Sequence, residues 1–281
     1  MLWLLACASK TPPQVALPLP VSTSQADLVL FFAGEQRANL DVCGCEARPR
    51  GGLARSSAWI EASRAANPGV PDLVLMAGGS LMEQDDDVQN GRMLQGLSQL
   101  GVDGVNLSAG EVPSALRGGS PDYLLSANVE GFPASRRLQR GELDIVVVGV
   151  TKLGSTVEPA PGHRVVDPVA AGVAELQAHL DADLLVLLTY GDSQLGPQIA
   201  EQVPELDVVI DARMHQGLYE PVDLEHAVLV RSPYQGLRLG ELRLSLSEGE
   251  VTDYAFLSND LDDRVPRDPG FEALLTTAGG D

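Results

Sequence analysis

Two cysteines separated by one glycine, Cys43 and Cys45, carry the most distinctive chemistry in this sequence. In an oxidising compartment such a pair closes a small strained disulfide ring, and strain makes a disulfide easier to reduce. The pair precedes a glycine-rich helix entrance, where a helix N-terminus lowers the pKa of a thiol. Three interpretations stay open: a structural disulfide, a thiol-disulfide exchanger, and one end of a soft metal site.

The third cysteine, Cys7, closes the apolar string Leu4-Leu5-Ala6-Cys7, which resembles a bacterial lipobox. The apolar run is short and no Lys or Arg precedes it, which a start codon placed too late would explain. Residues 8–24 are rich in proline and small polar residues, so they predict a tether. We therefore expect residues 1–7 to be the remnant of a lipoprotein signal and Cys7 to carry lipid. The protein would then be anchored in the bacterial envelope, facing the periplasm or the exterior.

Composition limits the possible partners. The 281 residues include 39 acidic and 19 basic side chains, which leave a formal charge of −20. This charge repels nucleic acid phosphates, so we expect no nucleic-acid partner. The length suits one α/β domain, and residues 25–260 show no shift in composition that would divide them.

Short apolar runs alternate with helical patterns along that domain, which predicts strands joined by crossover helices. The predicted strands are 28–32, 73–76, 105–107, 145–149, 184–188 and 208–210. Helical spacing appears in 53–66, in the stripe Met93, Leu94, Leu97 and Leu100, and in the stripe Val169, Val173, Leu176 and Leu180. Antiparallel strands are expected at 227–230, 238–246 and 251–257, and residues 261–281 are expected to form a frayed C-terminal tail.

Other polar clusters have simpler interpretations. Glu83 and the acidic run 85–87 lack the spacing of an EF-hand loop, so we interpret them as solvated residues before a helix. The three histidines His163, His179 and His226 are too far apart in sequence to indicate a metal site.

Several strings resemble, in their order, the N-terminal catalytic domain of 5′-nucleotidases in the calcineurin-like metallophosphoesterase superfamily. The strongest is Cys43-Gly-Cys45 followed by the Gly-Gly-Leu-Ala-Arg string 51–55, and supporting strings lie at 125–129, 149–151 and 236–242. The resemblance spans 27–257 and implies a single α/β domain with a four-layer α/β/β/α sandwich. The Cys-Gly-Cys string is similar to a subfamily in which selenocysteine can replace one cysteine.

The resemblance also implies a pair of divalent metals bridged by an aspartate and a hydroxide that attacks phosphorus. In this chain Glu35-Gln36-Arg37 stands where the family has Asp-x-His, and Gly79 stands where it has the bridging Asp. Ala109-Gly110-Glu111 replaces Asn-His-Glu, and Tyr190 replaces a histidine. In the last motif, 211–215, only His215 keeps its expected place.

Glu35 and His215 alone are not expected to hold two metals. We therefore predict a catalytically degenerate protein without a cofactor, which acts by binding a protein or a small anionic ligand, or through Cys43 and Cys45. Arg37 and Arg213 either bind an anion at the former metal site or point into solvent. The alternative is an active phosphoesterase with Mn, Fe or Zn held by Glu35, Glu111, Asp211 and His215.

Overall fold

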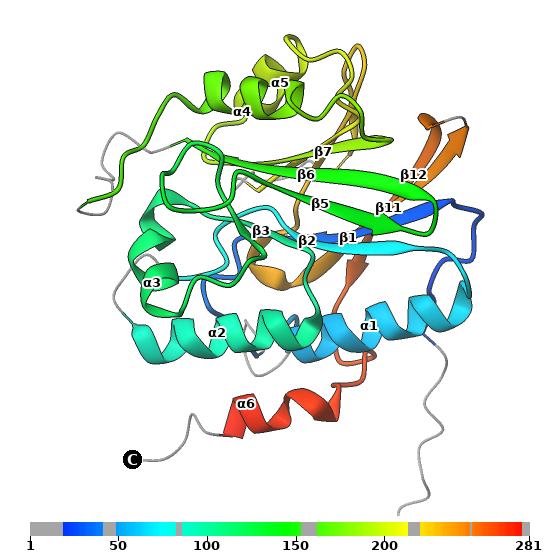
Figure 1. Cartoon of the computed structure of the whole chain (residues 1–281). Coiled ribbons are helices and arrows are strands. Elements are labelled where there is room, and N and C mark those ends of the chain that lie inside the picture. The colour runs from blue at the N-terminus through cyan, green and yellow to red at the C-terminus, as the bar shows by residue number, and fades with distance from the viewer. Residues whose placement is uncertain are drawn as a thin grey trace, which may run out of the picture.

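The structure, a computed structural model, describes residues 19–41, 49–82, 86–152, 162–212, 220–247 and 249–276. Two six-stranded sheets lie face to face, with helices covering the outer face of each (Figure 1). The predicted four-layer α/β/β/α sandwich is confirmed.

The first sheet has the order β12-β11-β1-β2-β3-β4. Strands β1 to β4 are parallel, and β11 pairs with β1 in the antiparallel direction. The strands are β1 (Leu28–Ala33), β2 (Asp72–Met76), β3 (Gly104–Asn106), β4 (Leu124–Leu125), β11 (Arg238–Ser247) and β12 (Glu250–Asp260).

The second sheet has the order β5-β6-β7-β8-β10-β9, with a parallel centre between antiparallel edge strands. Its strands are β5 (Ser135–Arg140), β6 (Leu143–Thr151), β7 (Leu184–Tyr190), β8 (Val208–Asp211), β9 (Val222–Asp223) and β10 (Val228–Arg231). Each parallel strand directs its carboxyl end to the same edge of its sheet, so the loops that follow these strands gather there.

Helices α1 (Leu53–Ala66), α2 (Asp87–Leu100) and α3 (Val112–Arg117) cover the first sheet, whereas α4 (Pro168–Gln177) and α5 (Leu195–Ala200) cover the second (Figure 1). Asp86 begins α2 by accepting a hydrogen bond from the Gln89 amide at 2.9 Å, as the interpretation of the acidic run requires. Helix α4 ends at Gln177, so Leu180 lies beyond it and is 46% exposed. The predicted stripe was therefore wrong at its last position.

Successive side chains of a strand point to opposite faces of its sheet, and the buried ones form three separate hydrophobic cores. In β1, Val29 and Phe31 face α1 and α2, while Leu30 and Phe32 face the second sheet. A third core lies between the second sheet and α4 and α5. Because β1 is buried on both faces, its sequence reads as a continuous apolar run.

The C-terminal boundary of the domain differs from the expectation. Leu261, Val265, Phe271 and Leu274 are buried in the helix-side core, and a helix α6 (Glu272–Thr276) lies beneath α2 (Figure 1). The prediction of a frayed tail from residue 261 was therefore wrong for residues 261–274. A short segment with few apolar residues gave no periodic signal, yet its four apolar side chains find space on the helix layer.

The predicted tether, residues 8–24, includes residues that belong to the folded domain. Leu19 and Val21 pack against the helix-side core, and the Ser22 and Ser24 carbonyls accept hydrogen bonds from Asn67 and Arg243. Residues 19–24 therefore belong to the folded domain. Residues 8–18 lie outside the described part of the chain.

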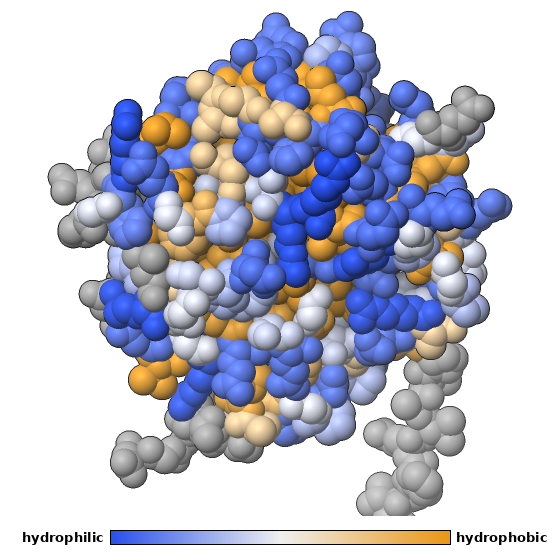
Figure 2. Space-filling view, in the orientation of Figure 1, coloured by the Kyte–Doolittle hydropathy of each residue, from blue (hydrophilic) through white to orange (hydrophobic). Residues whose placement is uncertain are grey.

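The surface is mostly hydrophilic on the face shown in Figure 2, where hydrophobic atoms show through between polar ones. Among the described side chains, the large hydrophobic ones that are exposed are Val88, Leu180 and Val222, which lie at separate places in the fold. None of the described helices has the length and apolar character needed to cross a bilayer.

Candidate functional site

The loops that follow β1 and β2 run side by side at the carboxyl edge of the first sheet. The amides of Glu35, Arg37 and Ala38 donate to the carbonyls of Gly78, Gly79 and Ser80 at 2.8, 2.9 and 2.8 Å. These bonds extend the pairing of β1 with β2 beyond the ends of both strands. They place the Glu35-Gln36-Arg37 string directly against Gly79, as its position after the first strand predicts.

The β1 loop has an unusual backbone conformation. Glu35, Arg37 and Ala38 have φ of 56°, 49° and 56°, which lie in the left-handed region that residues other than glycine rarely adopt. Each such residue costs about 1–2 kcal/mol, so the contacts around the loop must hold it in place. Gln36 contributes one such contact, since its side chain is buried and donates to Met76 Sδ at 3.0 Å.

This conformation brings Glu35 and Arg37 together. Arg37 Nε donates to Glu35 Oε2 at 3.0 Å, and Arg37 Nη2 lies 2.9 Å from the same oxygen. The Glu35 side chain is 5% exposed, whereas that of Arg37 is 48% exposed and lies 5.9 Å from the Tyr234 ring centroid. Partial burial acts to lower the pKa of Arg37, but the hydrogen bond and charge of Glu35 raise it above its usual value. The guanidinium is thus a permanent cation beside the carboxylate.

A side chain at Gly79, where the resemblance places the bridging aspartate, would be crowded by its neighbours and strained in its backbone. A Cβ atom on Gly79 would lie 3.1 Å from Glu35 Cα and 3.1 Å from Tyr190 Cε2, and Gly79 has a φ of 69°. A Cβ on Gly78 would lie 2.7 Å from Tyr190 Cδ2. The Tyr190 ring, which replaces an expected histidine, therefore packs over both glycines.

Glu111 is held by the backbone. It is completely buried, and its carboxylate accepts hydrogen bonds from the amides of Leu81 (2.5 Å), Ser108 (2.6 Å) and Gly79 (3.3 Å). Burial raises its pKa to about 7 against the opposing effect of these hydrogen bonds. Glu111 therefore ties the loop after β2 to the loop after β3, and both of its oxygens are already engaged.

Asp211 ends β8 and lies at the same edge of the second sheet. It is 2% exposed, and its Oδ1 accepts a hydrogen bond from Thr189 Oγ1 at 3.1 Å. The two sheets meet here, because a Cβ on Gly34 would lie 2.6 Å from Ala212 Cβ. The structure thus brings Glu35, Arg37, Glu111 and Asp211 to one edge, although they come from three segments that follow or end β1, β3 and β8.

The donor side chains that the structure describes at this edge do not fit a two-metal centre. Across the described ranges, no three His, Cys, Asp or Glu side chains are grouped so that they could hold a metal ion. Glu35 is engaged by Arg37, Glu111 by three amides, and Gly79 offers no side chain. Arg213 and His215 lie outside the described residues, as do Cys7, Cys43 and Cys45.

Two contributors to this edge had no signal in the sequence. Tyr234 lies under Arg37 although about two hundred residues separate them in the chain. Asn106, which reads as a strand residue, donates to the carbonyls of Ala77 at 3.0 Å and Val150 at 2.8 Å. It therefore joins the first sheet to the second directly below the site.

The segments on both sides of the Cys43/Cys45 pair also reach this edge. The Leu53 amide donates to the Leu40 carbonyl at 3.0 Å, so the described residues before and after the pair lie side by side. A Cβ on Gly51 would lie 2.6 Å from the Gly236 carbonyl oxygen, and one on Gly236 would lie 3.3 Å from Gln36 Cγ. The described residues that flank the cysteine pair therefore lie beside the Glu35-Gln36-Arg37 loop.

Comparison with known proteins identifies the fold. No family model and no curated protein sequence matches the chain. Among solved structures, a 5′-nucleotidase precursor from Thermus thermophilus superposes with a TM-score of 0.71 at 18% identity, over 89% of this chain and 58% of that one. The sulfate thiohydrolase SoxB from the same organism gives 0.75 at 17% identity, over 90% of this chain and 60% of that one.

A third structure, described as a novel phosphatase from Mycoplasma pneumoniae, gives a TM-score of 0.54 at 10% identity and matches 88% of this chain and 98% of that one. The present chain thus spans about three fifths of the first two proteins but nearly all of the third. Its fold is the metallophosphoesterase-like α/β fold that it shares with these structures, as the sequence strings predicted.

Proposed function

We propose that this chain is an envelope lipoprotein whose metallophosphoesterase-like domain no longer hydrolyses phosphoesters and instead binds a ligand or partner at the carboxyl edge of its sheets. One observation carries the proposal: the buried Glu35 carboxylate is paired with Arg37. A guanidinium cannot coordinate a metal, and its positive charge repels a divalent cation at the same oxygen.

The remaining residues support this proposal. Activation of water by two metals needs a carboxylate that bridges them and compensates their charge. Gly79 supplies none, and the Tyr190 ring crowds the position that a side chain on Gly79 would take. What the edge does offer is a half-exposed guanidinium on an aromatic ring, which suits recognition of a small anion or of polar groups on a protein.

Metal analysis and an activity assay test the proposal together. We expect well under one Mn, Fe or Zn ion per chain after equilibration with metal and gel filtration, and no turnover of nucleoside monophosphates above a blank with Mn²⁺. The Arg37→Ala variant should behave in the same way, because it frees Glu35 but leaves Gly79 without a carboxylate. Arg117→Ala, which removes an exposed arginine paired with Asp87, is the matched control.

The competing function is a phosphoesterase with an altered metal site built from Glu35, Glu111, Asp211 and His215. It requires stoichiometric metal and chelator-sensitive hydrolysis. Two ions per chain, or nucleotidase activity that disappears in His215→Ala, would overturn the proposal. A gain of tightly bound metal in Arg37→Ala but not in Arg117→Ala would show that Arg37 alone blocks a latent site.

The membrane location is part of the same proposal. The string Leu4-Leu5-Ala6-Cys7 and the proline-rich residues that follow support lipid attachment at Cys7. We expect the native protein to partition into the detergent phase and to carry lipid on Cys7, whereas Cys7→Ser should stay in the aqueous phase. Recovery of a soluble form that still bears Met1 would contradict it.

Thiol-disulfide exchange by Cys43 and Cys45 is a second candidate function. It is favoured by the position of the flanking residues, since Leu40 and Gly51 lie at the carboxyl edge beside Gln36 and Gly236. In this reaction the pair would accept two electrons from a partner dithiol, which becomes a disulfide. Mass spectrometry of the unreduced tryptic peptide should show the Cys43–Cys45 disulfide, and two free thiols in air-exposed protein would count against it.

A further inference from the structure

A cavity lies at the end of the sandwich opposite the candidate site, where the amino ends of β1 and β2 meet two hairpin turns. It has a volume of about 380 Å³. Its walls come from the start of β1, the residue before β2, the β5–β6 hairpin and the β11–β12 hairpin: Asp27, Pro71, Arg140, Gly141, Glu142, Leu143, Leu246 and Gly249. The cavity shares no residue with the carboxyl-edge site.

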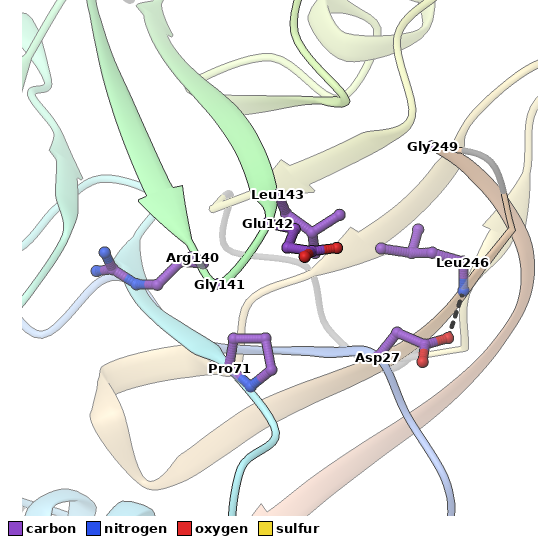
Figure 3. Close-up of a pocket in the computed structure, with 8 residues that line it drawn as sticks. All are labelled: Asp27, Pro71, Arg140, Gly141, Glu142, Leu143, Leu246 and Gly249. Carbon is purple, nitrogen blue, oxygen red and sulfur yellow. Dashed lines mark hydrogen bonds between the residues drawn. The ribbon is translucent and has the colours of Figure 1, made fainter.

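Its lining is apolar within and acidic at the rim. Figure 3 shows the Glu142 carboxylate and the Leu246 side chain facing each other across the hollow, with Pro71 below them. Glu142 is exposed and has neither a hydrogen bond nor an ion pair to any described residue. Asp27 adds a second carboxylate, one oxygen of which accepts the Leu246 amide at 2.8 Å.

The one basic residue in the lining does not neutralise these acids. Arg140 points away from the hollow in Figure 3, and its guanidinium pairs with Asp103 and donates to the Asp72 carbonyl at 3.0 Å. The cavity therefore presents uncompensated negative charge above an apolar floor. This combination matches a lysine side chain, whose four methylene groups bury against apolar surface while the ammonium group stays with a carboxylate.

We propose that this cavity is a docking site for a lysine side chain of a basic protein segment, with Glu142 as the main carboxylate partner. The net charge of −20 favours the approach of such a partner. The shape of the cavity then distinguishes a seated lysine from a diffuse attraction to the whole acidic surface.

The test is an NMR titration of the full chain carrying Cys7→Ser, which keeps it in solution. The probe is the blocked pentapeptide Gly-Gly-Lys-Gly-Gly, and its control replaces lysine with norleucine, which keeps the apolar stem but lacks the ammonium. We expect the lysine peptide to shift the amide signals of Gly141, Leu143 and Gly249. The norleucine peptide should not shift them.

Two charge-matched variants decide the outcome. Glu142→Gln should weaken binding of the lysine peptide about fivefold, whereas Glu225→Gln, which removes an 88% exposed carboxylate elsewhere, should not change it. Equal effects of the two variants would show diffuse attraction and overturn the proposal. Equal shifts with the norleucine peptide would also overturn it, because the ammonium would then have no role. Neither result depends on whether the carboxyl-edge site binds metal.

Discussion

Two Glu-x-Arg strings in this chain have the same spacing and different structures. In Glu35-Gln36-Arg37 the pair lies on a left-handed loop, and the Arg37 side chain is 48% exposed. In Glu241-Leu242-Arg243 the pair lies on β11, where residues two apart share a face, and the side chains are 0% and 1% exposed. The first pair is at the candidate site, whereas the second lies inside the domain.

The difference in hydrogen bonding explains what each pair does. Arg243 donates to Glu241 Oε1 and Asn67 Oδ1 at 2.8 Å each, and its Nε donates to the Ser24 carbonyl at 3.1 Å. It therefore joins β11, the end of α1 and the N-terminal segment. Within the described part of the chain, the Arg37 guanidinium contacts Glu35 and the Tyr234 ring, so part of its hydrogen-bonding capacity faces outward. A buried network stabilises the fold, while a half-exposed pair is available for recognition.

The largest expected effect comes from breaking the buried pair. Arg243→Met should lower the free energy of unfolding by about 3–5 kcal/mol, because Glu241 would remain buried without its cation. Arg238→Met, on the same strand but with a 36% exposed side chain paired to Asp260, should cost at most about 1 kcal/mol. Urea midpoints at constant slope give both values, and similar losses in the two variants would refute the distinction.

The half-buried carboxylate of Asp207, which accepts a hydrogen bond from the Leu185 amide, should make stability depend on pH. Burial raises the pKa of Asp207 to about 7, with the Leu185 amide opposing the shift and the charge of Glu250 adding to it. The unfolded residue titrates near pH 4, so between about pH 4 and pH 7 only the folded state keeps the proton. This group's contribution to stability therefore falls as pH rises through that window.

Asp207→Asn removes the contribution, so it should stabilise the protein at pH 8 by about 2–4 kcal/mol and have little effect near pH 4. Urea unfolding of variant and parent at both pH values measures this. The Asp207→Asn variant should retain some pH dependence of its stability, because the pKa of Glu111 is also raised to about 7. An equal gain at both pH values would contradict the assignment to Asp207.

The exposed pair should contribute little to stability. Arg37→Ala should change the free energy of unfolding by at most about 1 kcal/mol, because water can replace a half-exposed guanidinium. The same denaturation experiment as for Arg243 checks this directly. A loss as large as that of Arg243→Met would mean that the Glu35–Arg37 pair is part of the structural core and not a recognition group.

The smallest expected effect on stability concerns the left-handed backbone conformation of the loop that carries Glu35 and Arg37. Gly101 ends α2 with a φ of 74°, whereas Gly91 lies within that helix, and a Cβ would meet nothing within 4 Å at either position. Gly101→Ala should therefore cost about 1 kcal/mol through backbone conformation alone, and Gly91→Ala should stabilise by about 0.5–1 kcal/mol. Thermal unfolding of the two variants measures the free-energy cost of a positive φ in a residue with a side chain, the conformation that Glu35, Arg37 and Ala38 each adopt. If both alanines stabilise the protein, that cost is absent.

The sequence by itself determined the order of the long buried strands and of α1, α2 and α4, and hence the α/β class of the fold, whereas it predicted no counterpart of β4, β5, β9, α3, α5 and α6. The predicted helix 53–66 agrees with α1 to the residue, and the predicted strands differ from β1, β2 and β6 to β8 by a few residues at their ends. This succeeded because a strand buried on both faces must be apolar throughout, and a helix must repeat its apolar residues with its turn. The sequence alone also shows Gly79 and Arg37 at positions where the resemblance implies metal ligands.

Only the tertiary structure decided what those replacements do. Sequence spacing gave no means to distinguish Glu35–Arg37 from Glu241–Arg243, because burial depends on segments such as Ser24 and Tyr234 that are distant along the chain. It also left open whether Glu111 could bind a metal, which depends on three amides that the loops direct toward its carboxylate. The physical reason is that periodicity follows from local geometry, whereas the charge, solvation and partners of a side chain are set by what packs against it.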